Sequence, residues 1–237
     1  MPNSTDPSSV QQTLTLQEAL DVGLQHHTAG DLSKAEDIYQ QILQTDPNHP
    51  DALHLLGVIS HQMGENDRAV ELIKKALIIK PDFAEAHSNL GAAFQKLGRL
   101  DEAVDNCHKA IQINPDYAEA LNILGVALRE LGNLDEAVTN FRKALSIKPD
   151  YGEAHNNLAN TLHELGQSEE AVNCYYKALN IKPGWAEVHN NLGITLLDQG
   201  KLNEAVASYH KALAIEPHYA EAHNNLGTAF LDLGKLE

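Results

Sequence analysis

Residues 84–117 read AEAHSNLGAAFQKLGRLDEAVDNCHKAIQINPDY, and residues 118–151 read AEALNILGVALRELGNLDEAVTNFRKALSIKPDY. The second stretch repeats the first in register, with a period of 34 residues that continues in both directions along the chain. Such a period indicates one small structural unit copied head to tail. The same position holds proline in every complete copy, at Pro47, Pro81, Pro115, Pro149, Pro183 and Pro217.

This register divides the chain into six complete copies and one shortened copy of the unit. A position within a copy is called a place below, and place 1 is the first residue of each copy. Residues 1–14 are polar and contain two prolines, which predicts a disordered leader before one repeat array over 15–237. The copies are 16–49, 50–83, 84–117, 118–151, 152–185, 186–219 and the partial copy 220–237.

Each copy has the pattern of two helices joined by a glycine turn. In residues 84–117, Leu90 and Phe94 recur at helical spacing on one face. Gly98 follows, and glycine at this place permits the left-handed residue that commonly ends a helix. Pro115 ends the second helix, because proline lacks an amide donor and disfavours a helical residue before it. The sequence therefore predicts an all-α fold of antiparallel helix pairs.

Small residues and helix caps refine this prediction. Gly91 and Ala103 leave room for the two helix backbones of one copy to approach each other closely. Asp82 and Asp101 are expected to cap the two helices of residues 84–117, since aspartate accepts hydrogen bonds from first-turn amides.

Composition limits the class of partner. The formal net charge is −16, so neither nucleic acid nor an anionic membrane is an expected partner. No stretch of the sequence is long and apolar enough to span a bilayer. Cys107 and Cys174 are expected to pack as small apolar side chains, which predicts a reducing, cytoplasmic location.

The 34-residue pattern resembles the tetratricopeptide repeat. The resemblance covers the chain from about Leu16 to Glu237, and it implies a right-handed superhelix (an α-α solenoid) with the first helices on its concave face. It also implies a protein-binding scaffold, although it does not identify the ligand. One departure is place 4, often tryptophan in the family, which here is histidine in four copies: His87, His155, His189 and His223.

The last copy stops at Glu237, before its second helix would begin. Its packing residues Leu226, Phe230 and Leu233 then have no following helix to cover them. Because a repeat array needs a polar cap at its end, this pattern predicts a fragment of a longer protein. Self-association through the uncapped last helix is a further expectation.

Asparagine recurs on the face that the resemblance assigns to the groove. An asparagine side chain offers both a donor and an acceptor, so it can hold a peptide bond whatever the neighbouring side chains are. Two interpretations stay open, peptide contact and a purely structural ladder between neighbouring helices. The candidate peptide-binding residues, at places 5 and 6, are Asn89, Asn122, Asn156, Asn157, Asn190, Asn191, Asn224 and Asn225.

Two functions follow from these candidates. The stretches AEAHSNLG and AEAHNNLG look like repeats of the peptide-selecting arm of protein O-linked N-acetylglucosamine transferase. The first prediction is a non-catalytic scaffold that binds an extended, neutral or basic peptide segment in the groove. The alternative is the substrate-selecting arm of a larger glycosyltransferase of that kind, whose catalytic domain is absent from this chain. Whether the whole protein is an enzyme therefore stays open.

Other chemistries have weaker support in the sequence. A clamp for acidic chaperone tails needs basic inner residues, and only Lys96 and Arg129 approach the expected groove. The place 4 histidines lie on different repeats, whose helices pack about 8–10 Å apart, whereas zinc ligands must reach within about 2 Å of the metal. No metal, cofactor or catalytic residue is therefore expected in this chain.

Overall fold

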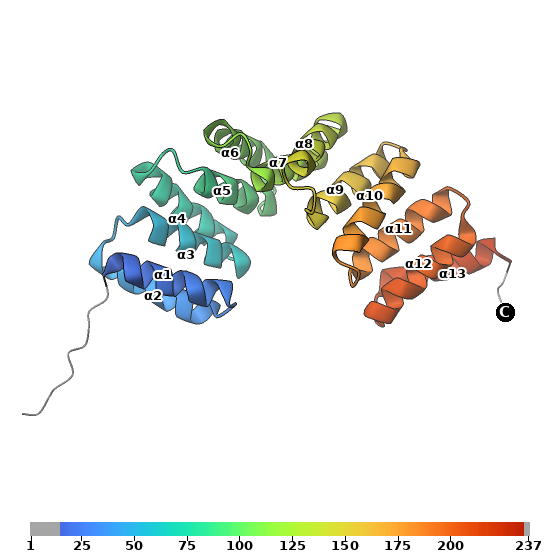
Figure 1. Cartoon of the computed structure of the whole chain (residues 1–237), viewed down its shortest axis with the longest axis horizontal. Coiled ribbons are helices and arrows are strands. Elements are labelled where there is room, and N and C mark those ends of the chain that lie inside the picture. Colours follow the sequence, from blue (N-terminus) through green and yellow to red (C-terminus); the bar gives the residue numbers. More distant parts are fainter. Residues whose placement is uncertain (1–14, 235–237) are drawn as a thin grey trace, which may run out of the picture. The chain divides into compact units, whose positions relative to one another are not determined.

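The computed structural model describes residues 15–234, and the predicted leader 1–14 lies outside this range (Figure 1). The described residues form thirteen helices and no strand. The helices are α1 Leu16–Thr28, α2 Leu32–Thr45, α3 Pro50–Gln62, α4 Asn66–Ile79, α5 Ala84–Lys96, α6 Leu100–Ile113, α7 Ala118–Glu130, α8 Leu134–Ile147, α9 Gly152–Glu164, α10 Ser168–Ile181, α11 Ala186–Asp198, α12 Leu202–Ile215 and α13 Ala220–Asp232.

Helix contacts divide the chain into two compact units, Met1–Ala86 and His87–Glu237, and the boundary falls near the start of α5. In the first unit, α1 packs on α2, α2 on α3, and α3 on α4. Its core includes the fully buried Tyr39 and Ile59.

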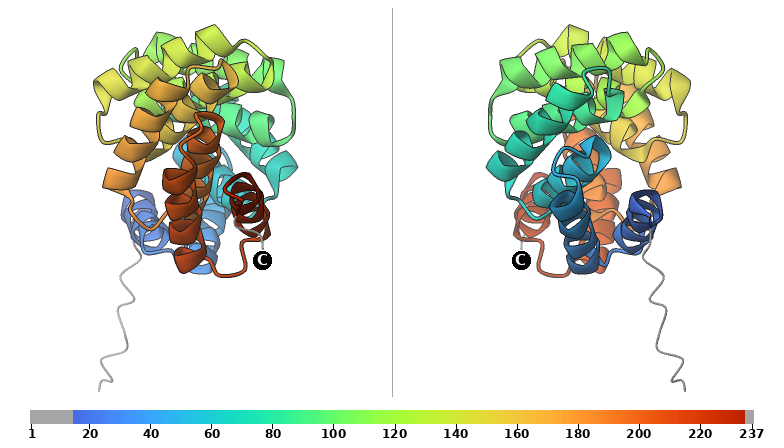
Figure 2. Two further views of the ribbon diagram at one scale, coloured as in Figure 1. Left: turned by 90° about the vertical axis from the view of Figure 1, so that its right-hand side faces the viewer. Right: turned by 90° about the vertical axis from the view of Figure 1, so that its left-hand side faces the viewer.

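In the second unit, each odd-numbered helix from α7 packs on the even-numbered helix that follows it, and this pair packs on the next (Figures 1 and 2). The first helices also touch one another, α7 with α9, α9 with α11, and α11 with α13. Within the described part of this unit, no comparable contact joins the second helices α8, α10 and α12. The first helices therefore form one continuous face of the second unit, called the first-helix face below.

Glycine explains how the two helices of a pair come together. A Cβ atom on Gly125 would lie 2.6 Å from the ring of Phe141 on the facing helix, closer than side-chain atoms pack. A Cβ atom on Gly91 would lie 2.7 Å from Cys107 Sγ, which confirms the close approach predicted there. The turn prediction is also confirmed, because Gly98 has a φ of 70°, a conformation that favours glycine.

The predicted helix caps need a correction. Helix α5 begins at Ala84, so Phe83 precedes its first residue and Asp82 stands one residue too early to cap it. Arg99 occupies the N-cap position of α6, and Asp101 lies inside the first turn. There its carboxylate favours the helix through the positive end of the helix dipole rather than through a capping bond.

One buried side chain lacks hydrogen-bond partners and provides a stability test. Gln199 follows α11, and neither Nε2 nor Oε1 of its buried amide has a partner among the described residues. The equivalent residues of neighbouring copies are Leu131 and Leu165. We expect Gln199→Leu to raise the free energy of unfolding by about 1–2 kcal/mol, because it removes two unsatisfied polar atoms. Urea denaturation would measure the change, and an unchanged or lower stability would contradict this account.

Candidate functional site

The predicted asparagines lie on the first-helix face, where several of them bond to one another. Asn157 Nδ2 donates to Asn122 Oδ1 at 3.1 Å, and Asn225 Nδ2 donates to Asn190 Oδ1 at 3.0 Å. Each bond joins place 6 of one copy to place 5 of the copy before it, a separation of 35 residues. The ladder therefore links the first helices of consecutive copies.

The two acceptors in these bonds are also donors. Asn122 Nδ2 donates to the hydroxyl of Tyr151 at 3.4 Å, and Asn190 Nδ2 donates to Glu221 Oε1 at 3.1 Å. Both asparagines are buried, and Asn190 is fully buried. The fold thus uses both ends of these two amides.

The ladder has gaps that follow from the sequence. Ser88 Oγ is buried and has no hydrogen-bond partner within residues 15–234, and the residue 35 positions later is Ile123, whose side chain has no donor. Asn156 Oδ1 is also buried without a partner, because Asn191 Nδ2 donates instead to Asn160 Oδ1 at 3.3 Å. In both gaps, the side chain at place 5 lacks a hydrogen bond because the residue at place 6 of the next copy does not donate to it.

Burial separates the eight predicted residues into two groups. The structure buries Asn122, Asn156 and Asn190. The remaining five are half-buried or exposed, and they are the ones that a ligand could reach: Asn89, Asn157, Asn191, Asn224 and Asn225.

The histidines at place 4 bind the loop that precedes their helix. Nε2 of His155 lies 2.9 Å from the carbonyl oxygen of Pro149, and His189 and its proline repeat this contact at 3.0 Å. Burial lowers the pKa of both imidazoles, although the bond to the carbonyl partly opposes that effect. The histidine at place 4 therefore fastens the preceding loop to its helix in both copies.

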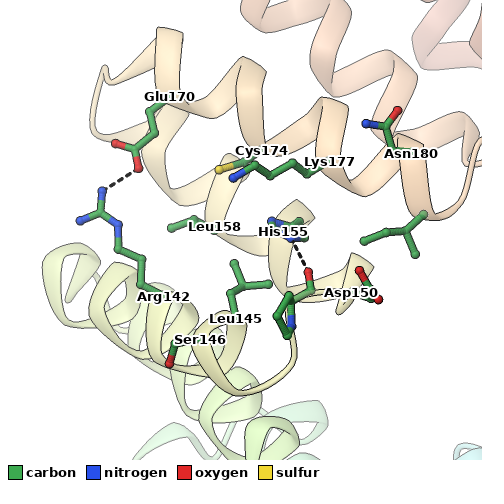
Figure 3. A pocket seen from close by; sticks show the side chains of 12 residues that line it. Arg142, Leu145, Ser146, Asp150, His155, Leu158, Glu170, Cys174, Lys177 and Asn180 are labelled. Carbon is green, nitrogen blue, oxygen red and sulfur yellow. Dashed lines mark hydrogen bonds and ion pairs between the residues drawn. The ribbon is translucent and has the colours of Figure 1, made fainter.

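A crevice of about 550 Å³ lies between α8 and α10, and residues of α9 also line it (Figure 3). His155 and Cys174 line it, and an ion pair of 2.7 Å joins Arg142 to Glu170 beside it. A similar crevice of about 420 Å³ contains His189, one copy further along. Since the crevice recurs with the repeat, it follows from helix packing rather than from a specialised site.

A further cavity, of about 260 Å³, opens on the first-helix face. Sequence reasoning did not select it, although place 9 offered a signal, because Asn160 stands where neighbouring copies have Val126 and Ile194. This cavity is called the Asn160 pocket below. Its lining residues are Arg129, Asn160, His163, Glu164, Tyr175, Asn191 and Ile194.

Comparison with known proteins supports one family. Tetratricopeptide repeat models match residues 26–93, 82–150 and 140–173, and a TPR repeat model matches 159–200 and 193–234. The crystal structure of MamA is 31% identical to this chain, with a TM-score of 0.58, and the match covers 69% of this chain and 95% of MamA. The chain belongs to the tetratricopeptide repeat family. The predicted all-α solenoid of helix pairs is thereby confirmed.

Two further structures share the tetratricopeptide fold at lower identity. A chain of the APC/C hetero-tetramer Cut9-Hcn1 is 21% identical with a TM-score of 0.85, and the match covers 91% of this chain but only 43% of that one. YrrB, described as a TPR protein with an unusual peptide-binding site, is 21% identical with a TM-score of 0.61, and the match covers 84% of this chain and 98% of YrrB. No curated protein matches the chain.

The remaining features concern metals and membranes. Within residues 15–234, no group of three His, Cys, Asp or Glu side chains is placed to hold a metal ion. None of the described helices of this tetratricopeptide repeat protein is long and apolar enough to cross a membrane. Cys107 and Cys174 are both buried free thiols, and burial raises the pKa of each.

Proposed function

We propose that this chain is a non-catalytic scaffold that binds an extended, neutral or basic peptide segment along the first-helix face of its second unit. The observation that carries the proposal is a set of ladder oxygens that accept no hydrogen bond from any residue within 15–234. Asn157 and Asn225 use Nδ2 in the ladder, and Asn191 uses Nδ2 toward Asn160, so each keeps its Oδ1. These three acceptors recur one copy apart along the first-helix face, where they can accept hydrogen bonds from N–H donors of an extended peptide.

Charge supports a neutral or basic peptide. Helices α9, α11 and α13 contain no lysine or arginine, while each has a glutamate at its second residue, Glu153, Glu187 and Glu221. A face that combines acceptor oxygens and carboxylates attracts donors and cations and repels acidic segments. The same fold carries a peptide-binding site in YrrB, which supports the proposal at the level of fold.

The test replaces Asn157, Asn191 and Asn225 together with alanine. We expect binding of neutral and basic peptides, measured on a peptide array at two salt concentrations, to weaken by about tenfold or more, since one hydrogen bond to each oxygen is lost. Helical content by circular dichroism should stay nearly unchanged.

A matched control replaces Asn140, Asn173 and Asn203, which lie on the second helices, and should bind as the wild type does. A triple ladder variant that loses its helical content would show that these asparagines serve only the fold. A folded ladder variant with undiminished binding would also contradict the proposal.

The substrate-selecting arm of a larger glycosyltransferase is the second proposal, supported by the resemblance of the AEAHNNLG stretches. Reading the gene beyond Glu237 tests it, because a nucleotide-sugar-binding domain there would favour the arm over a free scaffold. A cytoplasmic location stays a prediction in both cases.

Self-association through α13 is a third, weaker proposal. Among the described residues, no atom lies within 4 Å of a Cβ atom built on Gly227, the place that packs on a second helix in other copies, and Leu231 is 54% exposed. Light scattering with and without an appended capping helix would test it. Equal molecular masses for the two forms would contradict it.

A further inference from the structure

The fifth copy, residues 152–185, departs from its neighbours at two adjacent places. Place 8 is glycine in every other copy and alanine at Ala159, while place 9 is apolar in Val58, Val126 and Ile194 but is Asn160 here. In an array of near-identical units, such departures mark positions where something other than the common packing determines the residue. The structure shows that these two departures act together.

The methyl group of Ala159 occupies space that the ring of the facing tyrosine fills in other copies, and the facing residue here is Tyr175. In the next copy, a Cβ atom on Gly193 would lie 2.5 Å from the ring of Tyr209, so the ring occupies the space that a methyl group would need. The hydroxyl of Tyr209 is buried without a partner. Tyr175, which faces Ala159, instead donates its hydroxyl to Asn160 Oδ1 at 2.7 Å.

Asn191 joins the same acceptor and leaves the regular ladder to do so. Its Nδ2 donates to Asn160 Oδ1, at place 9 of the copy before it, whereas the equivalent Asn157 and Asn225 donate to place 5 of the copy before them. This choice leaves Asn156 Oδ1 buried without a partner. Asn191 of the sixth copy therefore bonds to Asn160 in place of Asn156, and this bond fixes the orientation of the Asn160 amide.

That orientation leaves specific atoms for a ligand in the Asn160 pocket. Since Asn160 Oδ1 accepts two bonds, its Nδ2 remains as a donor, and none of the described residues accepts from it. Arg129 adds further donors, because its Nε lies 3.9 Å from Glu164 Oε1, beyond hydrogen-bond distance. Asn191 Oδ1 supplies an acceptor in the same pocket.

The charged residues around the Asn160 pocket determine which kind of ligand fits it. Glu164 lines the pocket with Arg129, and Asp198 lies 3.5 Å from His163 at its edge. A carboxylate would meet these two acids, and an ammonium group would meet the guanidinium of Arg129. A neutral carboxamide meets neither penalty, because its oxygen can accept from Asn160 or Arg129 while its NH₂ donates to Asn191.

We propose that the Asn160 pocket binds the side-chain carboxamide of a glutamine or asparagine in the partner peptide. This inference rests on the proposed function and makes it more specific. The Asn160 pocket, a cavity of about 260 Å³ on the first-helix face, would select one side chain of the peptide. The ladder beside it would bind the peptide backbone whatever the other side chains are. A main-chain amide has the same chemistry, so the test must separate the two sources.

The test selects a displayed library of random peptides on the immobilised full chain. Wild-type protein is compared with Asn160→Val and with the control Asn173→Val on the outer helix α10. Valine already occupies place 9 in Val58 and Val126, so we expect Asn160→Val to fold, and Arg129→Gln provides a second pocket variant. The expected result is one alignable position enriched in glutamine or asparagine for wild type and control, and lost in Asn160→Val.

In the best selected peptide, changing that residue to glutamate or leucine should weaken binding by about tenfold, the effect of one good hydrogen bond or more. Peptides that bind wild type and Asn160→Val equally, with no carboxamide position, would overturn the pocket and leave the groove scaffold standing. A main-chain amide in the pocket would give a different result, namely no carboxamide position but weaker binding to Asn160→Val than to the wild type, and this would overturn the side-chain assignment. Failure to select any peptide would overturn the scaffold and the pocket together.

Discussion

Replacing Phe141 with alanine is expected to lower the free energy of unfolding by about 3–5 kcal/mol, as large-to-small changes at fully buried aromatic residues do. The Phe141 ring has no exposed surface and fills the space that Gly125 leaves on the facing helix. It also belongs to the core that joins consecutive copies of the second unit, together with Leu124 and Leu158. Removing it opens a cavity within one helix pair and weakens the contact with the next.

Denaturation in urea, followed by circular dichroism, measures this effect. The matched control is Ile78→Ala, because the Ile78 side chain is 80% exposed and its loss should change stability by less than about 0.5 kcal/mol. Since each repeat depends on its neighbours, the Phe141 variant should also unfold over a broader range of urea concentration. A loss below about 1 kcal/mol would show that the pair tolerates the cavity and would contradict this account of the core.

The 34-residue period is sufficient to predict the helix pairs, because the glycines that a helix pair needs recur at the same places in each copy. Gly98 needed a positive φ, and Gly125 needed the absence of a side chain, and both requirements can be read from residue type alone. Helix starts were predicted less well. Asp82 and Asp101 have the chemistry of caps, but α5 begins two residues after Asp82 and α6 begins one residue before Asp101.

The candidate site could be predicted only in part, because residue type does not fix the direction of a side chain. The sequence placed Asn122 and Asn157 on one face, but it could not show that they bond to each other across a copy boundary. Asn160 was visible as a departure, yet its consequence depends on where the hydroxyl of Tyr175 points. Such hydrogen bonds form between particular side chains of neighbouring copies. A repeat pattern gives the residue types that the copies share, but not the contacts in which one copy differs from the others.

Acidification from pH 7 to pH 4 is expected to cost about 3 kcal/mol of stability through His54 alone. This side chain on α3 is 6% exposed, and burial lowers its pKa from 6.5 to about 4. Asp51 opposes that shift, while Lys80 and His27 add to it. The unfolded chain therefore takes up a proton near pH 6.5 that the folded chain does not accept until about pH 4, so stability is full above that range and is lost as the pH falls.

The His54 contribution can be separated from acid effects on the many carboxylates by a matched variant. His54→Gln has no imidazole to protonate, so its stability, measured in urea at each pH, should fall less than that of the wild type between pH 7 and pH 4. His218→Gln, at an exposed loop position, should follow the wild type throughout. The ring of His54 packs edge to face on Phe83 at 4.6 Å between centroids, and protonation would place a charge in that buried contact. Parallel stability curves for wild type and His54→Gln would show that the folded state accommodates the protonated ring, for example by turning it toward Asp51, and would contradict the prediction.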